Sequence, residues 1–277
     1  MSDSLAGVLL VCDLDGTLLD SHSEISPQNL AAVLWLLERG GLFTVATGRN
    51  RLSVARFLPL LPLNAPAILY NGAMIYDFHS QTVLWSTTLP LNATAVIRLL
   101  RDIFPGIGVE IYHGEAVYVV SENNFITGHL AREHLMGIAS KSLGEIPVPW
   151  HKALLAWDPE KIDLVEAYLR RKGLSFSSLR SDPCYLEILP GKISKGSALR
   201  ILIRALGIPR SRVVAMGDQP NDLEMIKIAG WGIAVANAHQ SLKSRASSCC
   251  ADHDRHAVAE VIGWIAGKRP GDGSPVL

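Results

Sequence analysis

The sequence predicts an α/β fold, with a Rossmann-like core built on a parallel sheet and a smaller α+β cap inserted into that core. Two observations support this prediction. Short apolar runs alternate with helical patterns near the start of the chain and again near its end, which is typical of a parallel sheet. Between these stretches this regular alternation is lost, because two strand-like runs follow each other directly around His113-Gly114. We therefore predict core segments at 1–85 and 190–277 and the inserted cap at 86–189.

The first core segment is predicted to run strand, helix, strand, helix, strand. The apolar run 8–12 is the first strand. Ser26-Pro27 is typical of a helix start, and apolar residues at helical spacing follow until the glycine pair 40–41. The short apolar runs 42–46 and 66–70 predict the second and third strands of the parallel sheet.

The remaining elements are predicted in the same way. In the cap we expect helices that begin near Asn92 and Asp158, and strands on both sides of His113-Gly114, at 151–157 and at 185–189. The core pattern then returns, with a helix capped by Ser194 and strands at 212–216 and 232–236. The final stretch, 267–277, is rich in Gly and Pro and is predicted to be a loose tail.

Composition narrows the classes of function. A chain of 277 residues that is 48% hydrophobic and 19% charged is typical of a globular protein. The net charge is zero and no cluster of Lys and Arg occurs, so we expect neither a nucleic-acid nor a membrane partner. The first basic residue is Arg39, which argues against a signal peptide, and four irregularly spaced cysteines are typical of reduced thiols. We expect a cytoplasmic monomer or small homo-oligomer that acts on a small molecule.

Two carboxylates follow the first predicted strand, in Asp13-Leu14-Asp15-Gly16-Thr17. Ligands bind at the carboxyl ends of strands in open α/β sheets. Residues two apart in a strand point the same way, and the glycine predicts a sharp turn, so a nucleophile and a proton donor can converge there. Taken alone, the motif is equally consistent with a simple turn. A calcium loop is excluded, because such a loop requires Gly where this chain has Leu18.

Polar residues also follow two further strands. Thr47-Gly48 follows the second strand, and a turn with Asp218 and Asp222 follows a later one, although this turn alone is as consistent with an ordinary Pro/Asn turn. Asp13, Asp15 and these two carboxylates would repel one another by about 4 kcal/mol per pair at about 4 Å and an effective dielectric of about 20. A cation must offset this repulsion. Oxygen ligands shared with a phosphate favour Mg²⁺.

Lys195 lies in the first turn of a predicted helix, where a cation opposes the helix dipole. A phosphate oxygen would compensate this charge, and the Thr47 hydroxyl and the Gly48 amide would supply further donors. On its own, a lysine in this place is more typical of a solvated surface.

Together these motifs resemble those of the haloacid dehalogenase superfamily, and within it the Cof-like sugar-phosphate phosphatases with a large (type IIB) cap. The resemblance covers essentially the whole chain and rests on the segments 13–19, 46–49, 71–73, 194–196 and 217–222. It implies that Asp13 is the nucleophile that becomes an aspartyl phosphate, and that Asp15 is the acid and base.

The resemblance also implies the ligands of the metal and of the phosphate. Mg²⁺ would be held by the Asp13 carboxylate, the Asp15 carbonyl and Asp218, with Asp222 supporting the metal from nearby. The implied phosphate-binding residues are Leu14 through its amide, Thr47, Gly48, Lys195 and Asn221.

We therefore expect a Mg²⁺-dependent phosphatase of small phosphomonoesters such as sugar phosphates. A phosphomutase and a catalytically silent sugar-phosphate-binding regulator are the alternatives, whereas a dehalogenase would not need Asp15. Two loops depart from the family pattern. The chain has Val235-Ala236-Asn237-Ala238 where similar proteins read Met-Gly-Asn-Ala, and 255–259 differs from the usual ending Gly-Val-Ala. We expect neither loop to touch the catalytic residues.

Overall fold

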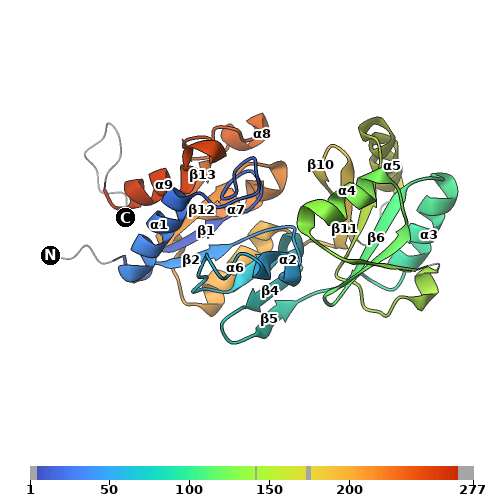
Figure 1. Ribbon diagram of the computed structural model, residues 1–277, viewed down its shortest axis with the longest axis horizontal. Helices are drawn as coiled ribbons and strands as arrows, with labels where there is room; N and C mark the ends of the chain where they lie inside the picture. Colours follow the sequence, from blue (N-terminus) through green and yellow to red (C-terminus); the bar gives the residue numbers. More distant parts are fainter. Residues whose placement is uncertain (1–4, 141, 173–175, 268–277) are drawn as a thin grey trace. The chain divides into compact units, whose positions relative to one another are not determined.

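The computed structural model describes residues 5–140, 142–172 and 176–267, which form two compact units (Figure 1). Among the described residues, the first unit takes in 5–47, 56–84 and 194–267, and the second takes in 48–55 and 85–193. The predicted cap limits, 86–189, remain a prediction. Apart from Gly267, the predicted tail lies outside the described residues. None of the described helices is long and apolar enough to cross a membrane.

The first unit is built on a parallel sheet, as predicted, but one of its five strands, β14 (Ser248–Cys249), was not predicted. The strand order across the sheet is β14, β13 (Trp231–Ala234), β12 (Val213–Gly217), β1 (Leu9–Cys12) and β2 (Leu42–Val45). Cys12, at the end of β1, lies between Val45 of β2 and Met216 of β12. Strands β12, β1 and β2 therefore end at the same edge of the sheet, and the polar residues that follow them are brought together.

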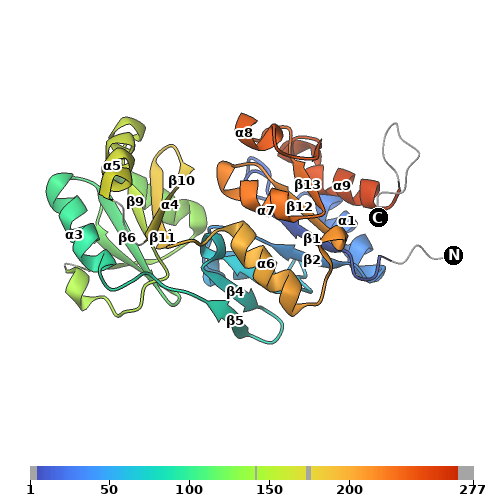
Figure 2. The same ribbon diagram turned by 180° about the vertical axis from the view of Figure 1, so that it is seen from behind.

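Helices cover both faces of this sheet. Helix α1 (Pro27–Glu38) packs against α9 (Ala257–Ile265), and α6 (Lys195–Ala205) packs against α7 (Leu223–Ile228), one pair on each face (Figures 1 and 2). Ser26 caps α1 by accepting a hydrogen bond from the Asn29 amide at 3.2 Å, as predicted. The unit also contains α8 (Gln240–Lys243) and the 3₁₀ turns η1 (Tyr70–Gly72), η3 (Arg210–Arg212), η4 (Pro220–Asp222) and η5 (His253–Arg255).

The third strand differs from the prediction. Strand β3 (Ala67–Leu69) lies beside β2 but pairs with it only through an isolated bridge between Ala46 and Ile68, and it pairs antiparallel with β4 (Met74–Asp77). These two strands and β5 (Thr82–Ser86) form a separate three-stranded sheet. The reason lies in the turn at Asn71-Gly72, where φ values of 53° and 103° reverse the chain at once into a hairpin.

The second unit is built on a six-stranded sheet. Its order is β10 (Phe176–Asp182), β11 (Tyr185–Pro190), β9 (Lys152–Ala156), β6 (Gly108–His113), β7 (Ala116–Ser121) and β8 (Gly137–Ala139), antiparallel except between β7 and β8. Its helices are α2 (Arg51–Ala55), α3 (Ala93–Ile103), α4 (Asn124–Glu133) and α5 (Pro159–Lys172), with the turn η2 (Leu143–Glu145). The predicted strands around His113-Gly114 are confirmed. Strand β10 was not predicted, because polar residues predominate in it.

The two faces of this second sheet differ in chemistry. Alternate residues of β6, such as Val109 and Ile111, belong to an apolar core, whereas Glu110 points to the other face. There the His129 ring has Nδ1 3.0 Å from a Glu110 oxygen and Nε2 3.2 Å from a Glu133 oxygen. All three side chains of this network are buried. Buried charges need such partners, because desolvation is costly.

The network shifts two pKa values in opposite directions. Burial lowers the pKa of His129, but the Glu133 charge and hydrogen bonds to both glutamates outweigh it and raise the pKa from 6.5 to about 9. Burial raises the pKa of Glu133, but His129 outweighs it and lowers the pKa from 4.5 to about 2. The histidine contribution to stability is therefore complete below pH 6.5 and lost through pH 9. The glutamate contribution is complete above pH 4.5 and lost through pH 2.

Glu133→Gln tests this network. We expect the variant to lower the free energy of unfolding near pH 6 by about 3 kcal/mol, and the difference from wild type to shrink near pH 10, where His129 is neutral. Urea denaturation at both pH values measures it. The control is Glu160→Gln, an exposed glutamate in the same unit. An effect of Glu133→Gln that is independent of pH would contradict the charge pairing.

Candidate active site

The site begins at the carboxyl end of β1. Asp13 is 5% exposed, and its amide donates to the Met216 carbonyl at 3.0 Å, so the aspartate continues the line of the sheet. The Leu14 amide donates to Asp13 Oδ1 at 2.8 Å. Leu14, Leu18 and Leu19 are buried, so apolar packing fixes the loop that carries the carboxylate.

Gly16 is required by the close approach of two loops. Its φ is +73°, and a Cβ atom built on it would lie 2.6 Å from Asp218 Oδ2. Both facts disfavour any side chain here. The glycine therefore lets the loop after β1 approach the loop after β12.

Lys195 is a buried lysine and not a solvated one. It is 1% exposed, in the first turn of α6, whose cap Ser194 accepts a hydrogen bond from the Ser197 amide at 2.9 Å. Lys195 Nζ lies 2.7 Å from Asp13 Oδ1 and 2.7 Å from Asp222 Oδ1. These two carboxylates raise the pKa of Lys195 against the effect of burial, so the ammonium stays charged.

Asp222 organises the turn after β12. Its Oδ2 accepts hydrogen bonds from the amides of Asp218 at 3.0 Å and Gln219 at 3.1 Å, while its Oδ1 faces Lys195. Asp222 is fully buried. The Gln219 side chain in turn donates to Asp218 Oδ2 at 2.9 Å. The turn is therefore built around Asp222, which orients both the lysine and Asp218.

One oxygen each from Asp13, Asp218 and Asp222 lies within 4.8 Å of the others. Burial and the Asp222 charge raise the pKa of Asp13, against the pull of Lys195, and burial and Asp222 raise the pKa of Asp218 to about 6. Three carboxylates beside one ammonium leave an excess of negative charge that a divalent cation would neutralise. Oxygen donors of this kind fit a hard cation such as Mg²⁺. The Asp15 carboxylate is not part of this group.

The predicted phosphate-binding residues fall into two groups. Thr47 is buried and held on both sides, because its amide donates to the Ile68 carbonyl and its carbonyl accepts from the Asn71 amide, each at 2.9 Å. Asn221 Nδ2 donates to Asn71 Oδ1 at 3.0 Å. Gly48 falls in the segment grouped with the second unit, where its carbonyl accepts from Lys152 Nζ at 2.9 Å.

Asn71 therefore links two of the predicted phosphate-binding residues, Thr47 and Asn221. Asn71-Gly72 was noted in the sequence only as part of a family motif, and no role was predicted for Asn71. Asn71 adopts a left-handed conformation with φ of 53°, which Asn tolerates better than most residues. The Asn-Gly pair was the available signal for this backbone.

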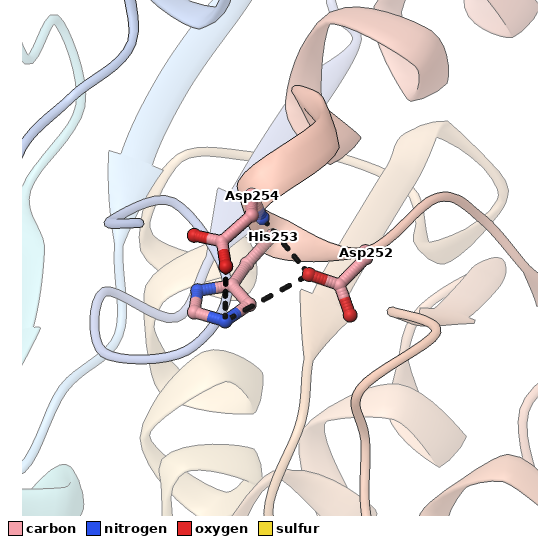
Figure 3. A group of neighbouring side chains, drawn as sticks. All are labelled: Asp252, His253 and Asp254. Carbon is pink, nitrogen blue, oxygen red and sulfur yellow. Dashed lines mark hydrogen bonds and ion pairs between the residues drawn. The ribbon is translucent and has the colours of Figure 1, made fainter. Parts of the chain in front are cut away.

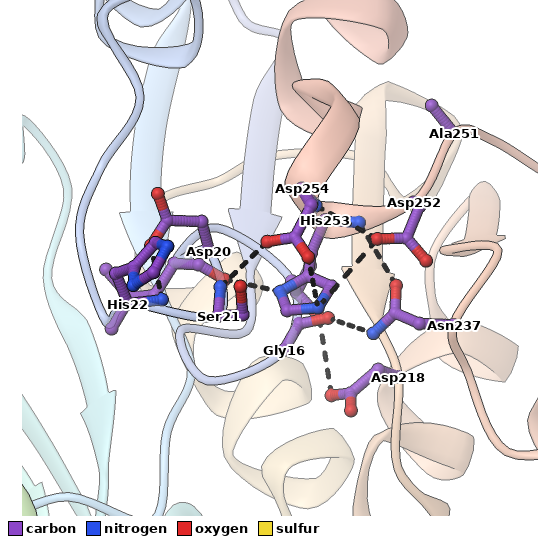
Figure 4. A network of polar contacts seen from close by, with 12 residues as sticks. Gly16, Asp20, Ser21, His22, Asp218, Asn237, Ala251, Asp252, His253 and Asp254 are labelled. Atoms are coloured by element: carbon purple, nitrogen blue, oxygen red, sulfur yellow. Dashed lines mark hydrogen bonds and ion pairs between the residues drawn. The ribbon is translucent and has the colours of Figure 1, made fainter.

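One of the two unusual loops, 235–238, contacts the loop after β1. Asn237 Nδ2 donates to the Gly16 carbonyl at 2.8 Å, inside the motif that carries Asp13 and Asp15 (Figure 4). The contact is to the backbone of Gly16, which is not one of the residues predicted to be catalytic. Parallel strands bring the loop after β13 beside the loop after β1, two strands away, and spacing along the chain does not reveal this.

A second group of possible metal ligands comprises Asp252, His253 and Asp254 (Figure 3). One oxygen of each carboxylate already accepts a backbone hydrogen bond. Asp254 Oδ1 accepts from the Ser21 amide at 2.8 Å, and Asp252 Oδ1 accepts from the Asp254 amide at 3.0 Å. Through Asp254, the turn η5 thus binds the loop after β1.

Lys195→Met tests the electrostatic account of the site. The substitution keeps most of the side-chain volume but leaves Asp13 and Asp222 without their shared cation. We expect the free energy of unfolding to fall by about 3–5 kcal/mol, because a buried charge loses its partner. Urea denaturation measures this loss, with exposed Lys227→Met on neighbouring α7 as the control. Equal stability of the two variants would contradict the account.

Comparison with known proteins is consistent with this geometry. A family model described as haloacid dehalogenase-like hydrolase matches residues 10–262. The pyridoxal phosphate phosphatase YbhA of Escherichia coli is 28% identical over 265 residues, which cover 92% of this chain and 97% of that protein. The HMP-PP phosphatase of Serratia proteamaculans is 31% identical over 245 residues, 85% of this chain and 86% of that protein.

Comparison with solved structures indicates the same fold. A haloacid dehalogenase-like hydrolase from Bacteroides thetaiotaomicron superposes with a TM-score of 0.85 at 29% sequence identity. The superposition covers 93% of this chain and 99% of the other. The predicted fold class is therefore confirmed.

Proposed function

This chain belongs to the haloacid dehalogenase-like hydrolases, and from that premise we propose that it is a Mg²⁺-dependent phosphatase that hydrolyses small phosphomonoesters through an aspartyl phosphate. The observation that carries the proposal is the buried ammonium of Lys195, 2.7 Å from both Asp13 and Asp222. This ammonium lies beside the proposed nucleophile and beside carboxylates that can bind a cation. The arrangement suits phosphoryl transfer, because positive charge is needed next to the phosphoryl oxygens.

The proposed reaction has two steps. Asp13 attacks phosphorus in line, and the ester P–O bond breaks with its electron pair moving to the leaving oxygen, which takes a proton from Asp15. Asp15, now a carboxylate, accepts a proton from the water that attacks the phosphoryl group. The bond to Asp13 then breaks and its electron pair returns to the carboxylate. Lys195 stabilises the negative charge on the phosphoryl oxygens throughout.

The metal site is proposed at Asp13, Asp218 and the Asp15 carbonyl, with Asp222 in support. When bound, Mg²⁺ supplies positive charge against the phosphoryl oxygens. The amides of Leu14 and Gly48, the Thr47 hydroxyl and the Asn221 side chain are the proposed further phosphate ligands. The buried positions of Asp13, Asp218 and Asp222 favour this assignment, because their mutual repulsion needs a cation.

The substrates named for the relatives support a small phosphate ester. The two curated relatives described above are named for pyridoxal phosphate and HMP-PP. We propose that this chain acts on a metabolite of that size, and that the cap proposed at 86–189 selects its organic part. A phosphate-release screen over sugar phosphates, pyridoxal phosphate and related esters with Mg²⁺ tests the proposal. Release of inorganic phosphate from single substrates supports a phosphatase, whereas isomerisation without release supports a phosphomutase.

A further inference from the structure

Two other segments of the first unit, the loop after β13 and the turn η5, form hydrogen bonds with the loop after β1. Asn237, just after β13, donates from Nδ2 to the Gly16 carbonyl at 2.8 Å. The same side chain accepts through Oδ1 from the His253 amide at 3.1 Å. One amide group thus joins the loop after β1 to the turn η5 (Figure 4).

The His253 side chain adds a second attachment. Its Nδ1 lies 2.9 Å from the Leu19 carbonyl oxygen. Because a carbonyl only accepts hydrogen bonds, Nδ1 carries the proton. Next to it, Asp254 Oδ1 accepts from the Ser21 amide at 2.8 Å. The loop is therefore held at Gly16, at Leu19 and at Ser21.

Two of these attachments flank Asp15. This aspartate is exposed, directly precedes Gly16 along the chain, and forms a β-bridge with Leu19. The two carbonyls that Asn237 and His253 hold thus belong to its chain neighbour and to its bridge partner. These two side chains therefore add to the apolar packing of the loop and help to fix the backbone of Asp15, whose own carboxylate is exposed.

We propose that Asn237 and His253 are positioning residues that hold Asp15 where it can protonate the leaving oxygen. The inference rests on the proposed function. In the step concerned, the proton passes from the Asp15 carboxyl to the ester oxygen as the P–O bond breaks and its electron pair moves to that oxygen. A misplaced acid slows this transfer most for a basic leaving group, which cannot depart unprotonated.

The dependence on the leaving group provides the test. With Mg²⁺ present, kcat/KM is measured for β-glycerol phosphate, which has a basic alkoxide leaving group, and for p-nitrophenyl phosphate, whose leaving group needs little protonation. We expect Asn237→Ala to lower kcat/KM about ten-fold or more for the alkyl ester and less than about three-fold for the aryl ester. His253→Ala removes the side-chain contact to Leu19 but keeps the backbone contact to Asn237, and it should change the ratio of the two kcat/KM values in the same direction. Asn237 is exposed and its loss leaves the core intact.

A double-mutant cycle shows whether Asn237 acts through Asp15. In an Asp15→Asn background, Asn237→Ala should no longer lower the rate with the alkyl ester, because the acid is already absent. Asn64→Ala is the matched control. Asn64 likewise joins two backbone groups, accepting from the Phe43 amide at 2.8 Å and donating to the Gly41 carbonyl at 3.1 Å, but it lies away from the loop after β1.

The outcomes separate the two proposals. A wild-type protein that releases phosphate from neither ester overturns the proposed function, and this inference with it. The positioning role alone is overturned if the wild type is active but Asn237→Ala and His253→Ala lower kcat/KM equally for both esters. Asn64→Ala would show such an equal decrease if it acted through stability. Additive effects in the double-mutant cycle also overturn it.

Discussion

Replacing Asp13 with Asn is expected to abolish turnover while the protein stays folded. The side chains have the same shape, but an amide is not a nucleophile at phosphorus. Loss of a nucleophile that acts with other groups costs about 10⁴–10⁶-fold in kcat. The Lys195 ammonium keeps Asp222 as its partner at 2.7 Å, so the buried cation is not left alone. Steady-state phosphate release measures the effect.

The control for this substitution is Asp102→Asn, an exposed aspartate on α3. It should retain wild-type kcat and wild-type stability. If Asp13→Asn retained more than about one hundredth of the wild-type activity, the decrease would be no larger than the decrease expected when a general acid or base alone is removed. Asp13 would then not be the nucleophile.

Removal of divalent cations is expected to have the second large effect. Treatment with EDTA should abolish activity, because three buried carboxylates face one ammonium and the excess charge would repel a phosphate. Added Mg²⁺ should restore activity fully. Ca²⁺ is larger and less strict in geometry, so it should support little turnover.

Thermal unfolding gives a readout of the cation that does not depend on turnover. Mg²⁺ should raise the Tm of the wild type, because a ligand that binds only the folded state stabilises it. Asp218→Asn should reduce this increase. Full activity after dialysis against EDTA, together with a Tm that Mg²⁺ leaves unchanged, would contradict a cation site at these carboxylates.

Much of the site could be predicted because it follows strand ends. Asp13 and Asp218 come directly after buried apolar runs, and the parallel sheet places such ends along one edge. Lys195 was recognisable from its unfavourable place in a helix, and the structure gives it two carboxylate partners. The shared location of Asp13 and Asp218 therefore follows from local sequence patterns and from the rule that parallel strands end at the same edge of a sheet.

Other features could not be predicted from local patterns. The links from Asn237 to Gly16 and from His253 to Leu19 join positions more than 200 residues apart, and neither residue lies in a periodic segment. The hairpin of β3 and β4 depends on the backbone at Asn71-Gly72, which was noted in the sequence only as part of a family motif. The charged face of the second sheet was missed as well, because Glu110 interrupts an apolar strand pattern without revealing its partner His129.

The covalent intermediate provides the most direct test of the account. In Asp15→Asn, p-nitrophenyl phosphate should still transfer its phosphoryl group, because its leaving group needs little protonation, while hydrolysis should stall without the base. Acid quenching followed by peptide mass spectrometry then locates the phosphoryl group. The account predicts one phosphoryl group on Asp13, and none in the Asp13→Asn/Asp15→Asn double variant. A phosphoryl group on another residue, or none in the single variant, would contradict it.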